Sequence, residues 1–326
     1  MPTVTVIVPN FNHRDYLEER LASIFNQTFD DYEVLLLDDA STDSSAELLQ
    51  SYATHLKVSQ LIINKDNSGS TFKQWNSGIE KAQGKYIWIA ESDDRAEPNF
   101  LSTMVMALEA DERKVIAYSQ STRIDKTGAA IGDWGDWTED LAPGLFKSDF
   151  EMSGIEFVER LLIHRNVIPN ASAVLFRREN YLFHAKADPT VKYCGDWLSW
   201  LKLALSGNVH YSAQKLNHFR QHEKSVIATR AANQKASFIK KYDIVMRKKL
   251  NDYLSAIDAP VSLREKSHAL LRKDAEKEAR LAIRNADREN ERRYNPLVAH
   301  NLSGTAKLRA QLRLLSYKIK TKMKSR

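Results

Sequence analysis

The chain has 326 residues, of which 43% are hydrophobic and 28% are charged, and it carries a formal net charge of +6 at pH 7. This length fits one large domain with an accessory region, or two domains, and the hydrophobic fraction is enough for a buried core. The single cysteine, Cys194, excludes a disulfide framework and fits a reducing compartment, and no apolar run reaches the roughly 18 residues that span a bilayer.

Short apolar strands alternate with helices over the first 120 residues. Strands are expected at 4–8, 33–37, 58–63, 86–90 and 115–119, and helices at 15–26, 41–52, 69–82 and 98–110. Strands that are apolar along their whole length are typical of a sheet covered on both faces. The alternation therefore predicts an α/β fold with a mainly parallel central sheet and right-handed crossovers.

The rest of the chain has a different character. Residues 120–170 are punctuated by glycines and predict irregular structure, followed by an expected strand at 171–176 and an expected helix at 197–205. Beyond them the pattern becomes long, charged and helical. We expect one domain at residues 1–228 and a helical C-terminal region at residues 229–326.

Two of the expected strands end in adjacent aspartates. Asp38 and Asp39 follow the second strand, and Glu91-Ser92-Asp93-Asp94 follows the fourth. The carboxyl ends of parallel strands meet at one edge of a sheet, so these carboxylates are expected to converge on one crevice. Such charges repel unless a cation or hydrogen-bond donors meet them, which indicates a site for a metal and a ligand. The alternative is that both acidic pairs serve only as N-caps of the following helices.

Six short motifs occur in order along the first part of the chain. They are Val-Ile-Val-Pro-Asn-Phe-Asn at 6–12, Gln27-Thr28-Phe29, Asp38-Asp39-Ala40-Ser41-Thr42-Asp43, Asn67-Ser68-Gly69-Ser70, Gly84-Lys85-Tyr86-Ile87 and Glu91-Ser92-Asp93-Asp94. With these motifs, residues 3–225 resemble a family 2 glycosyltransferase. The resemblance implies the GT-A fold, a nucleotide-diphosphate sugar as donor, and transfer to an acceptor hydroxyl with inversion of the anomeric carbon.

The resemblance also implies which residues bind the nucleotide. Asp39 matches the carboxylate that reads the base, and a carboxylate accepts a hydrogen bond from the ring N3–H of uracil or thymine, which favours UDP or dTDP. Pro9 and Phe11 match the segment that lies along the base, with ordinary core packing as the alternative for Phe11. Trp75 stands where many members carry an arginine, and Lys73 on the same helix is expected to replace that phosphate contact.

A divalent metal, Mn²⁺ or Mg²⁺, is implied as the cofactor. By the resemblance Asp94 is the direct metal ligand, and Asp93 acts on the ribose or on the water shell of the metal. The stretch 219–225 resembles an Arg-x-His-x-x-Ser element. In it His222 is expected to bind the metal or the diphosphate, with a structural role as the alternative, and Arg220 to contact a phosphate.

An inverting transfer needs a base that removes the proton of the acceptor hydroxyl. Asp196, at the start of an apolar helix, matches the catalytic aspartate of the family, and a plain N-cap is the alternative. The acceptor is expected to be a saccharide or a lipid-linked molecule in the synthesis of a surface polysaccharide or glycolipid. Trp134 and Trp137 are either acceptor contacts or a cover over the core.

The positive charge is concentrated at the C-terminal end. Residues 301–326 contain eight Lys or Arg and no Asp or Glu, which leaves 40 basic and 42 acidic side chains elsewhere. An apolar stripe recurs there at helical spacing and predicts a basic amphipathic helix at about 305–324; it consists of Leu308, Leu312, Leu315, Ile319 and Met323. We expect this helix to bind an anionic membrane surface, with packing of the stripe against residues 230–290 as the alternative.

The expected location is the cytoplasm, with a peripheral position on the inner face of the cell membrane. No signal peptide is expected, because Met1 and Pro2 lead directly into the first expected strand. Nucleic acid is not an expected partner, since the tail lacks interleaved aromatic residues and the acidic crevice would repel phosphates.

Two other functions compete with sugar transfer. A nucleotidyltransferase on a similar sheet would carry a glycine-rich loop after the first strand, where this chain has residues 9–13, which contain no glycine. A catalytically inactive sugar-nucleotide-binding protein would not need Asp39, Asp93, Asp94 and Asp196 together.

Overall fold

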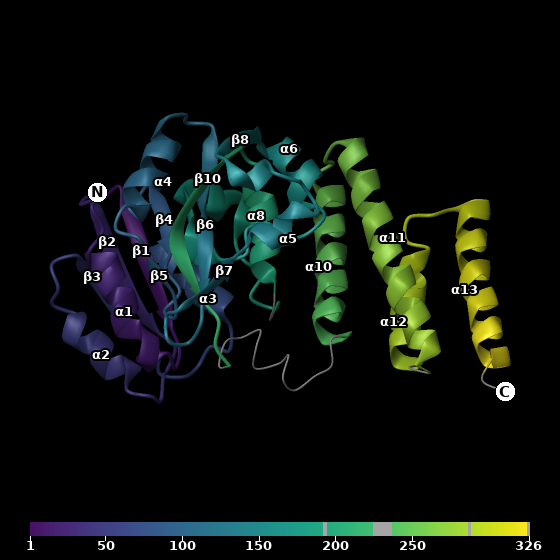
Figure 1. Cartoon of the computed structure of the whole chain (residues 1–326), viewed down its shortest axis with the longest axis horizontal. Coiled ribbons are helices and arrows are strands. Elements are labelled where there is room, and N and C mark those ends of the chain that lie inside the picture. The colour runs from purple at the N-terminus through teal and green to yellow at the C-terminus, as the bar shows by residue number, and fades with distance from the viewer. Residues whose placement is uncertain (192–193, 224–236, 286–287, 325–326) are drawn as a thin grey trace. The chain divides into compact units, whose positions relative to one another are not determined.

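The computed structural model describes residues 1–191, 194–223, 237–285 and 288–324 (Figure 1). Its internal contacts divide the chain into two compact units, Met1–Asn233 and Gln234–Arg326. The boundary that the sequence predicts near residue 228 lies outside the described residues.

A ten-stranded sheet forms the centre of the first unit. Its strands are β1 (Val4–Asn10), β2 (Tyr32–Asp38), β3 (Val58–Ile63), β4 (Tyr86–Ile89), β5 (Arg95–Ala96), β6 (Lys114–Ile124), β7 (Ala130–Asp133), β8 (Phe150–Ser153), β9 (Val174–Arg177) and β10 (Asn208–Arg220). The longer helices are α1 (Arg14–Phe25), α2 (Ser45–Tyr52), α3 (Thr71–Lys81), α4 (Phe100–Glu109) and α8 (Gly195–Ala204), and the shorter ones are α5 (Gly135–Glu139), α6 (Gly154–Phe157) and α7 (Arg178–Asn180).

The first half of the sheet has the predicted arrangement. Strands β3, β2, β1 and β4 lie side by side and run parallel. Helices cover both faces, because successive side chains of a strand point to opposite sides. Val6 and Leu36 pack with α1 and α4 in one buried cluster, whereas Gly78 of α3 lies against Ile7 and Leu37, where a Cβ atom would approach Ile7 to 2.7 Å.

The second half of the sheet is mixed in direction. β9 runs antiparallel between β4 and β6, so it separates two strands that the simple alternation would place together. β10 is a strand that the sequence analysis does not predict, and it pairs parallel with β6 and antiparallel with β5 and β8. Its pattern was hidden because polar residues, among them His210, Asn217 and His218, interrupt the apolar ones along the strand. β10 matters for function because it delivers Arg220 and His222 to the acidic edge of the sheet.

The first strand is longer than the expected 4–8. It continues through Pro9 to Asn10, which lies opposite Asp38 of β2. The pairing of β1 with β4 ends at Ile7 and Ile89, so the missing N–H of Pro9 falls beyond the paired part of β4 and costs no hydrogen bond. Proline is therefore tolerated inside this strand.

The second unit is helical. It consists of α10 (Ser237–Ala256), α11 (Val261–Arg284), α12 (Arg288–Val298) and α13 (Gly304–Lys324). A separate buried cluster joins these helices, and it includes Ile244, Leu271, Ala275, Tyr294, Val298, Ala310 and Leu314. Among the described helices, none is both long and apolar enough to cross a membrane.

Candidate active site

The acidic loop 91–94 follows β4 at the edge of the sheet where β1 and β2 also end. Asn10 lies opposite Asp38 at that edge, and the side-chain amide of Asn10 donates to Asp38 Oδ2 at 2.8 Å. The parallel order of the three strands brings their polar ends together, as predicted from the two aspartate pairs.

Asp94 is an internal anchor of this loop. Its Oδ2 accepts hydrogen bonds from Asn170 Nδ2 at 2.8 Å and Ser172 Oγ at 2.7 Å, and its Oδ1 accepts from the backbone N–H of Arg220 at 2.9 Å. The residue is only 1% exposed. Oδ2 of Asp94 thus holds two donors and Oδ1 holds one, so hydrogen bonds within the protein position this carboxylate. The role of direct metal ligand expected for Asp94 stays a prediction.

Asp93 faces a different group of side chains. Its Oδ2 lies 3.0 Å from Nε2 of His222, and one ligand atom from each of His13, Asp93 and His222 lies within 4.8 Å of the others. Nδ1 of His222 is buried and makes no hydrogen bond to a described residue. One carboxylate and two imidazoles are ligand types that divalent transition-metal ions accept, so these three residues are candidates for holding a divalent metal.

His13 is the site residue that the sequence analysis missed. It lies just after β1, and its Nδ1 is 2.9 Å from Ser92 Oγ of the acidic loop. Its ring meets the ring of His222 edge to face, with 5.4 Å between centroids. A histidine directly after a strand that ends at the acidic edge was the available signal.

The carboxylates of the acidic loop 91–94 are not fully balanced by positive charge. Burial, and then the neighbouring charge of Asp93, raise the pKa of Glu91 to about 8 and the pKa of Asp94 to about 7. For Asp93 burial acts in the same direction, but the hydrogen bond from His222 and the nearby His13 lower its pKa. Arg20 lies fully buried over the ring of Trp88, at 4.9 Å, and its guanidinium makes no hydrogen bond to a described residue. Burial lowers the pKa of Arg20 to about 10, against the pull of the three carboxylates.

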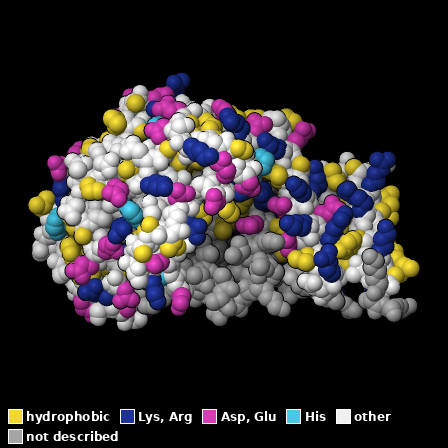
Figure 2. Space-filling model, in the orientation of Figure 1, with side chains coloured by type: hydrophobic (Ala, Val, Ile, Leu, Met, Phe, Trp, Pro, Cys, Tyr) yellow, Lys and Arg dark blue, Asp and Glu magenta, His cyan; other side chains and the backbone are white. Residues whose placement is uncertain are grey.

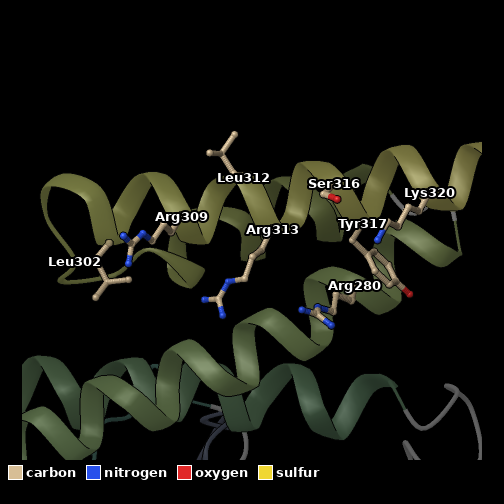
Figure 3. Close-up of a pocket in the computed structure, with 9 residues that line it drawn as sticks. Arg280, Leu302, Arg309, Leu312, Arg313, Ser316, Tyr317 and Lys320 are labelled. Carbon is tan, nitrogen blue, oxygen red and sulfur yellow. The ribbon is translucent and has the colours of Figure 1, made fainter.

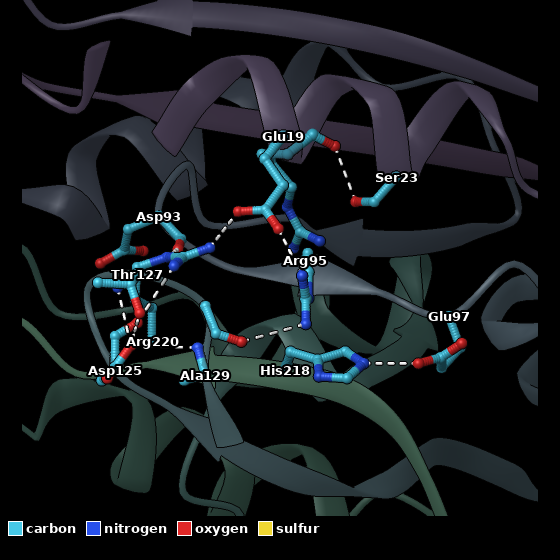
Figure 4. A network of polar contacts seen from close by, with 12 residues as sticks. Glu19, Ser23, Asp93, Arg95, Glu97, Asp125, Thr127, Ala129, His218 and Arg220 are labelled. Carbon is cyan, nitrogen blue, oxygen red and sulfur yellow. Dashed lines mark hydrogen bonds and ion pairs between the residues drawn. The ribbon is translucent and has the colours of Figure 1, made fainter. Parts of the chain in front are cut away.

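Arg220 is a structural clamp (Figure 4). Its Nε donates to the backbone carbonyl of Asp93 at 2.7 Å, and its guanidinium forms an ion pair with Glu19 of α1. Arg95 contacts the other oxygen of Glu19 at 2.6 Å. Because the Arg220 side chain is 1% exposed, it is not placed to reach a phosphate, and the expected phosphate contact becomes a role in positioning Asp93.

Asp39, directly after β2, accepts hydrogen bonds from four donors. Its Oδ1 accepts from Asn64 Nδ2, Gln74 Nε2 and the N–H of Ser68 at 2.7–2.9 Å, whereas its Oδ2 accepts only from Ser68 Oγ at 2.8 Å. A carboxylate oxygen accepts about two hydrogen bonds, so Oδ2 keeps capacity for one more donor. Gln74 and Asn64 were not singled out from the sequence.

The other expected nucleotide contacts differ in accessibility. Phe11, after β1, is 44% exposed and presents an open ring, whereas Pro9 is buried within β1. Lys73 is exposed on α3, and its Nζ donates to the backbone carbonyl of Ser68 at 3.0 Å, beside Asp39. Phe11 and Lys73 thus lie at the surface, whereas Pro9 does not.

Asp196 is the second residue of α8 and lies in its first turn. The N-cap position of this helix is occupied by Cys194 and not by Asp196. Asn166 Nδ2 donates to Asp196 Oδ2 at 2.8 Å. Burial raises the pKa of Asp196 to about 6, although the hydrogen bond from Asn166 opposes that rise. A carboxyl with a pKa near 6 is suited to accept a proton at neutral pH.

The segment 166–172 ties Asp196 to the acidic loop. Asn166 contacts Asp196 at one end of the segment, and Asn170 and Ser172 contact Asp94 at the other. The sequence analysis did not identify Asn166, because an isolated asparagine in an irregular region carries no signal of its own. Trp137 Nε1 also donates to the carbonyl of Asn166, at 2.8 Å.

The aromatic residues around the site divide into core and surface. Trp75 is 2% exposed, and its Nε1 donates to Glu91 Oε1 at 2.8 Å, so it packs on the sheet and orients the acidic loop. Trp134 stacks on Phe219, with 5.6 Å between centroids. Trp137 keeps 42% of its surface exposed. It is hydrogen-bonded to Asn166, which in turn is hydrogen-bonded to Asp196.

Comparison with known proteins finds a family match in the N-terminal part of the chain. Residues 5–163 match the family described as glycosyl transferase family 2. The putative teichuronic acid biosynthesis glycosyltransferase TuaG of Bacillus subtilis is 35% identical over 94 residues, which are 29% of this chain and 37% of that relative. The match therefore spans little more than a third of the length of that relative.

Two solved structures share the fold over most of the chain. TarS residues 1–349 of S. aureus, in complex with UDP, has a TM-score of 0.57 at 18% identity and covers 97% of this chain and 89% of that chain. The mannosyltransferase PcManGT of Pyrobaculum calidifontis, in complex with GDP-Man and Mn²⁺, has a TM-score of 0.51 at 18% identity. The superposition covers 99% of this chain and 84% of the PcManGT chain. At such identities the likeness shows the GT-A-type fold and no more.

Proposed function

We propose that the protein, whose residues 5–163 match the family described as glycosyl transferase family 2, transfers a sugar from a nucleotide-diphosphate donor to a hydroxyl of a saccharide or lipid-linked acceptor, with inversion at the anomeric carbon. The observation that carries this proposal is the arrangement around the acidic loop: the cluster of His13, Asp93 and His222, and a separate carboxyl, Asp196, whose pKa is raised to about 6. The segment 166–172 connects the two parts.

The donor is proposed to be a UDP- or dTDP-sugar. Oδ2 of Asp39 has room for one more hydrogen bond, and the ring N3–H of a uracil or thymine base would supply it. Phe11 would lie along the base, and Lys73 would meet the phosphates. The TarS structure described as a complex with UDP supports a uridine donor.

The cofactor is proposed to be Mn²⁺ or Mg²⁺ held by Asp93 and His222, with His13 as the third ligand. A bound divalent ion would supply positive charge to the diphosphate as it leaves. The fit rests on the donor set and on the shortage of positive charge in the loop, where burial and Asp93 hold the pKa of Glu91 and Asp94 above their ordinary values. The PcManGT structure described with Mn²⁺ supports the choice of metal.

Asp196 is proposed as the base. Its ionised carboxylate accepts the proton of the acceptor hydroxyl while that oxygen forms a bond to the anomeric carbon. The bond from the anomeric carbon to the diphosphate oxygen breaks in the same step, and the diphosphate leaves with the electron pair. Asn166 holds Asp196 in its position through the 2.8 Å hydrogen bond.

The biological setting is proposed from the relatives and from the C-terminal unit. A relative named for teichuronic acid biosynthesis favours a role in making a surface polysaccharide or glycolipid. The location proposed is the cytoplasm, with peripheral attachment to the inner face of the cell membrane through α13.

Turnover of a panel of UDP-, dTDP- and GDP-sugars tests the proposal. The protein is expected to release the nucleotide diphosphate from a uridine or thymidine donor only with Mn²⁺ or Mg²⁺ present. Asp196→Asn is expected to lower transfer about 100-fold or more while nucleotide binding stays unchanged. Turnover without any divalent metal, or full activity of Asp196→Asn, would refute the mechanism.

A further inference from the structure

Helix α13 has two different faces. Ala310 and Leu314 are 1% and 6% exposed and pack into the buried cluster of the helical unit. The apolar stripe that the sequence predicts lies elsewhere on the helix and is between 51% and 73% exposed; its members are Leu308, Leu312, Leu315, Ile319 and Met323. The stripe is thus not used to pack α13 on its own unit, and five large apolar side chains remain open.

A cationic groove lies between α11 and α13, beside this stripe (Figure 3). It has a volume of about 810 Å³. Four of the residues that line it are cationic: Arg280 from α11 and Arg309, Arg313 and Lys320 from α13. In Figure 3 Arg309 and Arg313 point toward α11, while Leu312 points away from it.

The charge of the groove is only partly balanced. Glu276 of α11 lies 2.5 Å from Arg280 and 3.8 Å from Arg313, so one carboxylate serves two arginines. Arg309 and Lys320 have no ion-pair partner in the part of the chain that the structure describes. The four cations and one carboxylate leave the groove with a net positive charge, which suits a phosphate group.

The position of the groove next to an open apolar stripe indicates what kind of phosphate it meets. A lipid bilayer offers acyl chains for the stripe and headgroup phosphates for the cations at the same surface, whereas a soluble anion or an acidic protein would leave the stripe in water. Figure 2 shows Lys and Arg side chains gathered with hydrophobic ones over the visible face of the helical unit. Residues 301–326 contain no acidic side chain that would oppose such a surface.

We propose that the groove formed by Arg280, Arg309, Arg313 and Lys320 binds the phosphate of an anionic lipid headgroup while the exposed stripe of α13 enters the bilayer. This deepens the peripheral location given with the proposed function and rests on it for its biological sense. The groove would select anionic lipids, and the stripe would supply the apolar part of the binding.

Sedimentation of the full chain with vesicles tests this surface. Wild type is expected to bind vesicles of phosphatidylcholine with about 30% phosphatidylglycerol, and to bind phosphatidylcholine alone about tenfold less or weaker. Arg309→Glu/Lys320→Glu should lose that tenfold preference, because neither side chain is needed for an internal ion pair. Leu312→Glu/Leu315→Glu should lose binding to both vesicle types.

Matched controls separate this effect from net charge and from folding. Lys81→Glu/Lys126→Glu makes the same charge change on exposed positions of the other unit, and Leu56→Glu places a glutamate at a leucine that is 86% exposed. Both variants are expected to bind like wild type. Circular dichroism should show unchanged helix content in every variant. Equal binding to the two vesicle types, or unchanged binding by both groove and stripe variants, would overturn the proposal.

A competitor distinguishes a membrane site from a general anion site. Inorganic phosphate that abolishes binding while the stripe variant still binds would also overturn the proposal, because it would show an anion site without bilayer insertion. Release of nucleotide diphosphate from the soluble donor is measured on the same preparations. If donor turnover is present and vesicle binding is absent, only the lipid proposal fails; if vesicle binding is present and turnover is absent, only the proposed function fails.

Discussion

Adjacent residues of the acidic loop have different tasks. A turn at Ser92 and Asp93 sends the two aspartate side chains to different partners. Asp94 points into the protein and binds Asn170 and Ser172, whereas Asp93 faces His222. The two carboxylates at this strand end therefore meet different groups: Asp94 meets neutral hydrogen-bond donors and Asp93 meets an imidazole.

Exchange of each aspartate for asparagine separates these tasks. Asp93→Asn is expected to lower metal-dependent donor turnover about 100-fold or more with little change in stability, because it weakens the open donor set. Asp94→Asn is expected to lower the free energy of unfolding by about 1–3 kcal/mol, because an amide group cannot accept all three hydrogen bonds. Metal titration and urea unfolding measure the two effects. The reverse pattern would return the metal ligand to Asp94.

The pH dependence of transfer reports on Asp196. The base acts only when ionised, and burial raises its pKa to about 6, so kcat/KM is expected to fall as pH drops through about 6. The hydrogen bond from Asn166 lowers this pKa. Asn166→Ala should therefore move the acidic limb of the profile to higher pH, while Asp196→Asn should remove transfer. An unchanged midpoint in Asn166→Ala would show that another group titrates.

At the scale of elements, the site depends on how closely neighbouring segments approach. The turn between α3 and β4 passes Gly84 directly over β1, where a Cβ atom would lie 2.4 Å from the backbone N of Thr5. The Thr5 hydroxyl also accepts a hydrogen bond from the N–H of Gly84 at 2.8 Å. This contact fixes β4, and with it the start of the acidic loop, against the central strand.

Two glycine substitutions measure the importance of that contact. Gly84→Ala is expected to lower the free energy of unfolding by about 3 kcal/mol, because rigid backbone stands in the way of the new methyl group. Gly69→Ala is the control, since its φ of 71° is unfavourable but its nearest neighbour is 4.0 Å away, and it should cost about 1 kcal/mol. Urea unfolding of both variants provides the comparison; equal losses would mean that close packing at Gly84 is unimportant.

At the scale of the whole molecule, each of the two units has a buried apolar cluster of its own among the described residues. One lies around the sheet with α1 and α4, and the other joins α10 to α13. Each unit is compact by its own internal contacts, so we expect each to hold its elements together. The proposed active site lies in the first unit and the proposed lipid surface in the second.

Separate expression of the two units tests this independence. The fragments 1–233 and 234–326 are each expected to fold, the first as a mixed α/β protein and the second as a helical one, with the circular dichroism of the two adding up to that of the whole chain. The first fragment should retain donor turnover. A 234–326 fragment without helical signal would show that its core does not suffice.

Much of the first unit could be predicted from local patterns. The strand and helix alternation, the convergence of two acidic strand ends and the family resemblance all depend on residues within short windows, and the parallel order of β3, β2, β1 and β4 follows from connection rules. The strand β10 could not be predicted, because its polar residues find partners on β5, β6 and β8, far away in sequence. Asn166 carried no local signal for the same reason, whereas the position of His13 directly after the first strand was a signal that the sequence analysis did not use.

By itself, then, the sequence determined the elements of the parallel half-sheet, the acidic edge and the amphipathic character of α13, because each is a periodic or local property of the chain. Only the tertiary structure decided that Asp93 and not Asp94 faces His222, that Arg220 clamps Glu19, and that the stripe of α13 stays open. The physical reason is that burial and hydrogen-bond partners depend on segments far apart in sequence. Which of two adjacent carboxylates is free for a ligand is settled only where those segments meet.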